Sequence, residues 1–70
     1  MSGLDASKKL ELLKAMRDYH EGRMEREKKI ALLQGIDPWK REGYRYNERQ
    51  FRGVSGRIRS IEREMAEASE

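Results

Sequence analysis

The sequence contains no cysteine, a single proline and few large apolar side chains. Without cysteine the chain can form no disulfide and no thiolate metal site. Leu, Ile, Val and Phe number twelve among 70 residues, and a chain this short buries only about 60% of its unfolded surface, so a closed enzyme pocket is not expected. We predict a single domain, residues 1–70, that is not an enzyme and carries neither metal nor cofactor.

Long hydrophobic runs are also missing. The longest apolar run is Ile30-Ala31-Leu32-Leu33, whereas a membrane-spanning helix needs about 18 consecutive apolar residues. The beginning of the sequence shows no apolar stretch typical of a secretory signal. We therefore expect a cytoplasmic protein without a membrane span, and adsorption to an anionic membrane surface stays open as a minor alternative.

Charge is abundant and unevenly placed. The chain has 16 basic and 13 acidic residues and a net charge of +3. Residues 39–59 hold seven basic and two acidic side chains, whereas residues 60–70 hold one basic and four acidic ones. All basic residues after Lys40 are arginines, which bind carboxylates and phosphates through paired N–H groups. The basic segment thus predicts an acidic partner.

The first half of the chain has the composition of a helix. Strong helix formers dominate from Asp5 to Gln34, with Asp5 placed as an N-cap and Gly35 as the residue that ends the helix. We predict a helix over residues 5–34, and Gly22 leaves open whether it is continuous. Its apolar stripe is expected to run through Leu12, Leu13, Met16, Tyr19, His20, Met24, Ile30 and Ala31. His20, the only histidine, is interpreted as a partly buried member of this stripe rather than a metal ligand.

The predicted connection covers residues 35–47. Asp37 followed by Pro38 is typical of a helix start, and Gly43 can end a short helical turn over 38–42. The alternation of tyrosines around Arg45 favours an extended segment after that turn.

A second helix is predicted over residues 48–68. Asn47 fits an N-cap, Gln50 stands at the third helical position, and Tyr46 is placed to pack on Phe51. The apolar residues of this helix follow a heptad spacing. The seam consists of Phe51, Val54, Ile58, Ile61 and Met65.

This seam is expected to need a covering partner. Gly53 and Gly56 lie beside it and would allow a second helix to approach closely. We predict an all-α, two-helix hairpin with a helical turn in the connection, which dimerises into a helical bundle. The C-terminal glutamates would then face arginines of the second copy, unless they belong to a solvated helix end.

Aromatic and arginine residues mark the candidate binding surface. Trp, Tyr and Arg are the residues most enriched at interface hot spots. The predicted partner-binding residues are Trp39, Arg41, Tyr44, Arg45, Arg49 and Arg52. Alternatively, Trp39 could serve the core by covering Leu33 and Phe51.

Two classes of function follow from these residues. The first is a protein–protein interaction module that meets an acidic protein surface. The second is a nucleic-acid-binding protein in which arginines contact phosphates, although the interleaved glutamates disfavour it. The arginines concerned are Arg45, Arg49, Arg52 and Arg59.

Residues 32–65 carry a family resemblance. The order of Leu32-Leu33-Gln34-Gly35, Tyr44-Arg45-Tyr46 and the segment from Phe51 to Glu62 resembles small bacteriophage proteins of the head–tail joining kind. The resemblance implies a helical protein that joins or modulates protein partners, as an adaptor or inhibitor, in the cytoplasm or in the virion. Residues 37–42 lengthen the connection relative to that pattern.

Overall fold

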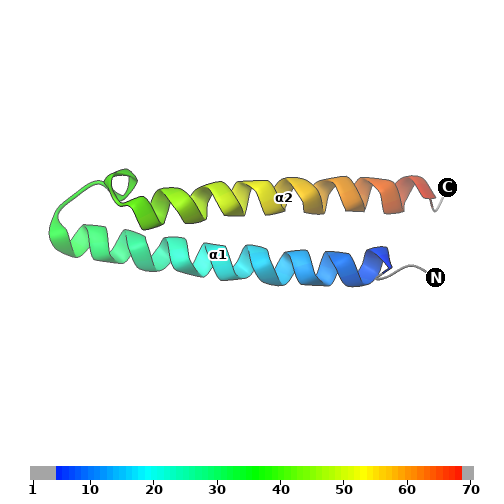
Figure 1. Ribbon diagram of the computed structural model, residues 1–70, viewed down its shortest axis with the longest axis horizontal. Coiled ribbons are helices and arrows are strands. Elements are labelled where there is room, and N and C mark those ends of the chain that lie inside the picture. Colours follow the sequence, from blue (N-terminus) through cyan, green and yellow to red (C-terminus); the bar gives the residue numbers. More distant parts are fainter. Residues whose placement is uncertain (1–4, 69–70) are drawn as a thin grey trace.

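The protein is a two-helix hairpin in the computed structural model, which describes residues 5–68. Helix α1 spans Ala6–Gln34, a short 3₁₀ helix spans Pro38–Lys40, and helix α2 spans Glu42–Ala68. The two helices lie side by side and antiparallel, with the start of α1 and the end of α2 at the same end of an elongated body of 51 × 21 × 13 Å (Figure 1). The predicted all-α hairpin with a helical turn is confirmed, while residues 1–4 and 69–70 of the predicted domain lie outside the described residues.

Helix α1 begins and ends where its capping residues predict. The Asp5 side chain accepts a hydrogen bond from the Lys8 backbone N–H at 2.9 Å, which satisfies one of the free donors of the first turn. Gly35 adopts the left-handed conformation with φ of 70°. Its N–H donates to Leu32 O, and the Ile36 N–H donates to Ala31 O, as in a Schellman motif. The helix is uninterrupted through Gly22, which answers the question that the sequence left open.

Two glycines of α1 should respond oppositely to alanine. A Cβ at Gly22 would meet no atom within 4 Å, so Gly22→Ala should raise the free energy of unfolding by about 0.5–1 kcal/mol through helix propensity. Gly35→Ala should lower it by about 1–2 kcal/mol because φ of 70° is strained for alanine. Urea unfolding followed by circular dichroism measures both changes, and equal signs would contradict the assignment of the helix end.

The second helix begins six residues earlier than predicted. Asp37 starts the 3₁₀ turn, since its side chain accepts from the Trp39 N–H at 2.9 Å. Arg41 is extended, and its carbonyl oxygen accepts the first α2 hydrogen bond, from the Arg45 N–H. Glu42 in the first turn favours a helix start here, because its negative charge is attracted to the positive end of the helix dipole. The predicted extended segment 44–46 is therefore helical.

Asn47 was predicted as the N-cap of this helix, and that prediction is wrong. Asn47 is buried inside α2, and its Nδ2 donates to Gly43 O at 2.8 Å. Its Oδ1 accepts from His20 Nδ1 of α1, also at 2.8 Å. Tyr46 contacts the His20 ring edge to face, with centroids 6.4 Å apart. The hydrogen bond to His20 on α1 satisfies the Asn47 side-chain amide inside the helix, so Asn47 does not cap a helix end.

The predicted apolar seam of α2 faces α1. Val54 and Ile58 are buried, Phe51 and Ile61 are half-buried, and Met65 is more exposed. With Ala31 of α1, Val54 and Ile58 are the only buried apolar residues in the range 5–68. Helix α1 of the same chain covers Val54 and Ile58 and shields Phe51 and Ile61 in part. The predicted dimerisation through this seam stays a prediction.

The face of α1 that meets α2 differs from the predicted stripe. Leu12, Met16 and Tyr19 are exposed. The positions turned toward α2 follow a three–four spacing and include polar residues that find partners on α2 or the connection. They are Leu10, Leu13, Arg17, His20, Met24, Glu27 and Ala31, of which Ala31 is buried and the others are half-buried. The prediction is confirmed for Leu13, His20, Met24 and Ala31, and Ile30 is also half-buried. It is wrong for Leu12, Met16 and Tyr19 because it followed hydrophobicity alone, whereas polar side chains with partners also occupy an interface.

Candidate functional site

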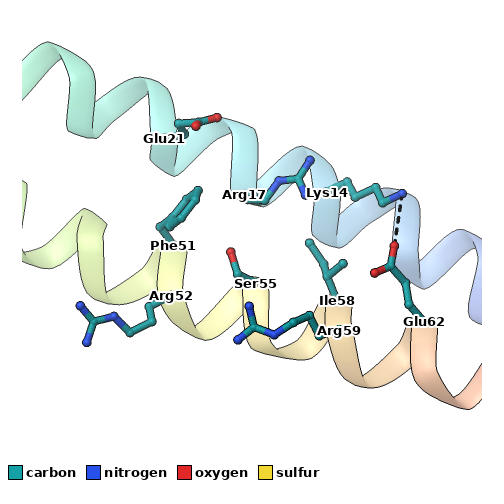
Figure 2. Close-up of a pocket in the computed structure, with 9 residues that line it drawn as sticks. All are labelled: Lys14, Arg17, Glu21, Phe51, Arg52, Ser55, Ile58, Arg59 and Glu62. Atoms are coloured by element: carbon teal, nitrogen blue, oxygen red, sulfur yellow. Dashed lines mark ion pairs between the residues drawn. The ribbon is translucent and has the colours of Figure 1, made fainter.

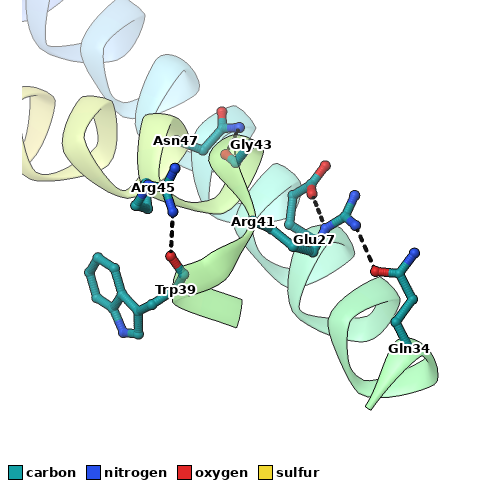
Figure 3. A network of polar contacts seen from close by, with 7 residues as sticks. All are labelled: Glu27, Gln34, Trp39, Arg41, Gly43, Arg45 and Asn47. Atoms are coloured by element: carbon teal, nitrogen blue, oxygen red, sulfur yellow. Dashed lines mark hydrogen bonds and ion pairs between the residues drawn. The ribbon is translucent and has the colours of Figure 1, made fainter. Parts of the chain in front are cut away.

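The turn surface at the closed end of the hairpin carries an exposed tryptophan. Trp39 is 50% exposed, and its ring projects from the 3₁₀ turn on the side away from Arg41 (Figure 3). The ring packs edge to face on Tyr44, with centroids 5.3 Å apart and an interplanar angle of 77°. Arg45 Nη1 donates to Trp39 O at 2.7 Å and fastens the 3₁₀ turn to the first turns of α2. Three of the predicted partner-binding residues therefore lie together.

Further apolar residues are exposed at the same end of the hairpin, at the end of α1. Leu32 is 79% exposed and Leu33 is 89% exposed, while Ile36 is more than one-third exposed. The alternative that Trp39 covers Leu33 is wrong, because Leu33 is almost entirely open to solvent. We define the turn surface as Leu32, Leu33, Ile36, Trp39, Tyr44 and Arg45. Sequence reasoning did not predict that Leu32 and Leu33 are exposed. Their position in the last turn of α1, just before Gly35, was the available signal, because the end of a helix is less fully covered by its neighbour.

Arg41 differs from the other predicted binding residues. Its Nε donates to Glu27 Oε1 at 2.7 Å, and its Nη1 donates to Gln34 Oε1 at 3.0 Å (Figure 3). The Glu27 side chain is only 14% exposed. Gly43 lies against the same carboxylate, since a Cβ there would come within 2.8 Å of Glu27 Cδ. Arg41 thus joins the connection to α1 and holds the turn surface in place against the end of that helix.

Arg49 and Arg52 lie on the outer side of α2, away from the turn surface. Both are exposed, and Arg52 forms an ion pair with Glu48 one turn earlier. The structure therefore separates the six predicted binding residues into three at the turn, one scaffold residue and two on the α2 surface.

A mixed-charge groove runs between the helices on the side of Arg52. Phe51 and Ile58 point from α2 toward α1, and Arg52 points away from the groove (Figure 2). Lys14 Nζ lies 3.8 Å from Glu62 Oε2, so a glutamate predicted to face a second copy pairs within its own chain. Both basic and acidic side chains line the groove. They are Lys14, Arg17, Glu21, Arg52, Arg59 and Glu62.

The remaining chemistry of the described chain is limited. Between residues 5 and 68, no group of three or more His, Asp or Glu side chains is placed to hold a metal ion. Neither helix of this range is long and apolar enough to cross a membrane. His20 is half-buried and donates to Asn47, as predicted for a member of the interface.

No protein-family model, curated protein or solved structure matches the chain.

Proposed function

We propose that this protein is a non-enzymatic protein–protein interaction module that binds its partner through the turn surface. The exposure of Trp39, Leu32 and Leu33 at one end of the hairpin carries the proposal. Exposed apolar clusters of this kind in small proteins mark interaction sites, and tryptophan is the commonest hot-spot residue. The support from Arg41 and Arg45 holds the turn in one conformation, which lowers the entropy lost on binding.

The charge around the turn surface favours an acidic partner. Residues 39–59 carry seven basic and two acidic side chains, and Lys40 and Arg45 are exposed at the turn itself. A partner with an apolar pocket rimmed by carboxylates would match both the aromatic residues and the arginines. An adaptor or inhibitor role, including the joining of virion proteins that the phage resemblance implies, would use this same surface.

Trp39→Ala should abolish partner binding without unfolding the hairpin. Loss of a central tryptophan commonly weakens a complex by about 2 kcal/mol or more, so recovery of the specific partner should fall by more than about tenfold. The measurement is quantitative affinity capture with the wild-type chain and the variant, together with thermal unfolding of both.

Tyr19→Ala is the matched control, because Tyr19 is an equally exposed aromatic residue on α1 outside the turn surface. It should leave partner recovery unchanged. Equal recovery of every partner by wild type and Trp39→Ala would remove the turn surface from the proposal.

Phosphate binding is the second candidate function. One observation favours it: Lys14 and Arg17 of α1 line the same mixed-charge groove as Arg59 of α2 (Figure 2). Glu21 and Glu62 in the same groove oppose it. Titration with random-sequence duplex at two salt concentrations separates the candidates, since affinity that falls steeply with salt indicates phosphate contacts. We expect no such binding.

A further inference from the structure

A line of arginines runs along the side of α2 opposite the buried Val54 and Ile58. The arginines recur at spacings of four, three, seven and four residues, so their side chains fall within a narrow sector of the helix surface. All of them are exposed. We define the arginine line as Arg45, Arg49, Arg52, Arg59 and Arg63. It extends over about 27 Å of the helix, and Arg45 belongs to the turn surface as well.

The chain itself leaves most of this charge uncompensated. Arg52 forms an ion pair with Glu48. The other members of the line that lie beyond the turn form no ion pair within residues 5–68, namely Arg49, Arg59 and Arg63. Residues 49–63 contain five basic residues and one acidic residue, Glu62. Glu62 is directed toward Lys14 of α1, 3.8 Å away (Figure 2), so it does not neutralise the line.

The basic residues of α2 are all of one type. Helix α1 contains both lysines and arginines, whereas every basic residue of α2 is an arginine. A guanidinium group binds a carboxylate or phosphate through two parallel N–H groups, whereas a lysine ammonium acts as a point charge. Either residue would keep a helix face solvated. The use of arginine alone therefore indicates that this face recognises oxyanions.

The spacing of the line favours carboxylates on a second helix. Arg45, Arg52 and Arg59 follow one another by seven residues, which is the period at which two adjacent helices meet in a coiled coil. Carboxylates at the same period on a helix beside α2 would reach the arginines along the whole line. A nucleic-acid duplex winds through most of a turn over about 27 Å, so its phosphates follow a straight line of this length only in part.

We propose that the arginine line binds an acidic helix of the same protein partner that docks on the turn surface. This inference rests on the proposed function, because the line starts at Arg45 of the turn surface and leads away from it along α2. The partner helix carries aspartates or glutamates at heptad spacing. Each exposed ion pair contributes little by itself, but a row of them sets the orientation and the rate of association.

Two alanine-based helical peptides of equal composition test this chemistry. One carries its glutamates at heptad spacing on a single face, and the other carries the same glutamates distributed around the helix. The full chain is titrated with each peptide at low salt, and circular dichroism verifies that all components are helical. We expect the heptad peptide to bind about tenfold more tightly, as several exposed ion pairs allow. Equal binding of the two peptides, or tighter binding of random-sequence duplex at the same concentration of anionic groups, overturns the proposal.

Removal of three arginines from the line tests their role. The triple variant Arg49→Gln, Arg59→Gln, Arg63→Gln should lose the preference for the heptad peptide, and it should stay folded because these side chains are exposed. The matched control removes the same charge from exposed positions of α1, namely Arg23→Gln, Arg26→Gln and Lys29→Gln. The control should keep the preference. A preference that survives in the first variant, or that is lost equally in both, overturns the proposal.

Quantitative affinity capture of the partner separates this inference from the proposed function. The Trp39→Ala variant and the triple variant of the arginine line should both recover less of the partner than the wild-type chain does. Loss of recovery with Trp39→Ala alone overturns the role of the arginine line and leaves the turn surface in place. Loss with the triple variant alone overturns the turn surface and leaves the binding of an acidic helix in place.

Discussion

Ile58→Ala is expected to lower the free energy of unfolding by about 3 kcal/mol, within the range of about 2–5 kcal/mol typical of isoleucine truncation in a core. Ile58 is 4% exposed and is one of three buried apolar residues in the described chain, with Ala31 and Val54. A domain of this size seldom has more than about 3–5 kcal/mol of stability from its core. The variant should therefore be largely unfolded at 25 °C in urea titrations followed by circular dichroism at fixed chain concentration.

Met65→Ala provides the comparison within the same seam. Met65 lies one heptad after Ile58 but is 38% exposed, so its truncation leaves a smaller loss of buried area. We expect a loss of less than about 1 kcal/mol. Similar losses for the two variants would mean that α1 does not bury the seam as described.

Arg41→Met should lower the free energy of unfolding by about 2 kcal/mol. The change leaves the carboxylate of Glu27, whose side chain is 14% exposed, without its guanidinium partner, and an unpaired buried acceptor of this kind costs about 1–3 kcal/mol. The connection also loses its link to Gln34. Thermal and urea unfolding of the variant at neutral pH measure the loss.

The double variant Arg41→Met, Glu27→Gln separates the ion pair from general packing. Removing both charges leaves no unpaired carboxylate, so the double variant should be more stable than Arg41→Met alone. Coupling between the two positions is measured by the full cycle of single and double variants. Losses that simply add would show that Arg41 and Glu27 act independently.

Local signals predicted the ends of α1 and the start of the connection. Asp5, Gly35 and Asp37 each make their hydrogen bonds with residues two to four positions away, so the neighbouring sequence contains both partners. The amphipathic pattern of α2 likewise predicted its inward face, because Val54 and Ile58 recur at helical spacing.

The candidate site was only partly predictable. The pairing of exposed Trp39 with half-buried Tyr44 follows from aromatic residues in the predicted connection. Arg41 has the same residue type and setting as Arg45, yet its partner Glu27 lies on α1, fourteen residues earlier. No local pattern shows that Arg41 pairs with a carboxylate on α1, whereas Arg45 bonds within the turn.

The sequence alone determined that the chain is helical, where α1 begins and ends, and which face of α2 is apolar, because helix propensity, capping and periodicity act over a few residues. The tertiary structure decided that α2 begins at Glu42, that Asn47 is buried on His20, and that Leu12 and Met16 stay open. These features depend on the register of α1 against α2. That register is set by pairs as distant as His20 and Asn47, whose mutual hydrogen bonding outweighs the capping preference of asparagine and the hydrophobicity of the outer α1 face.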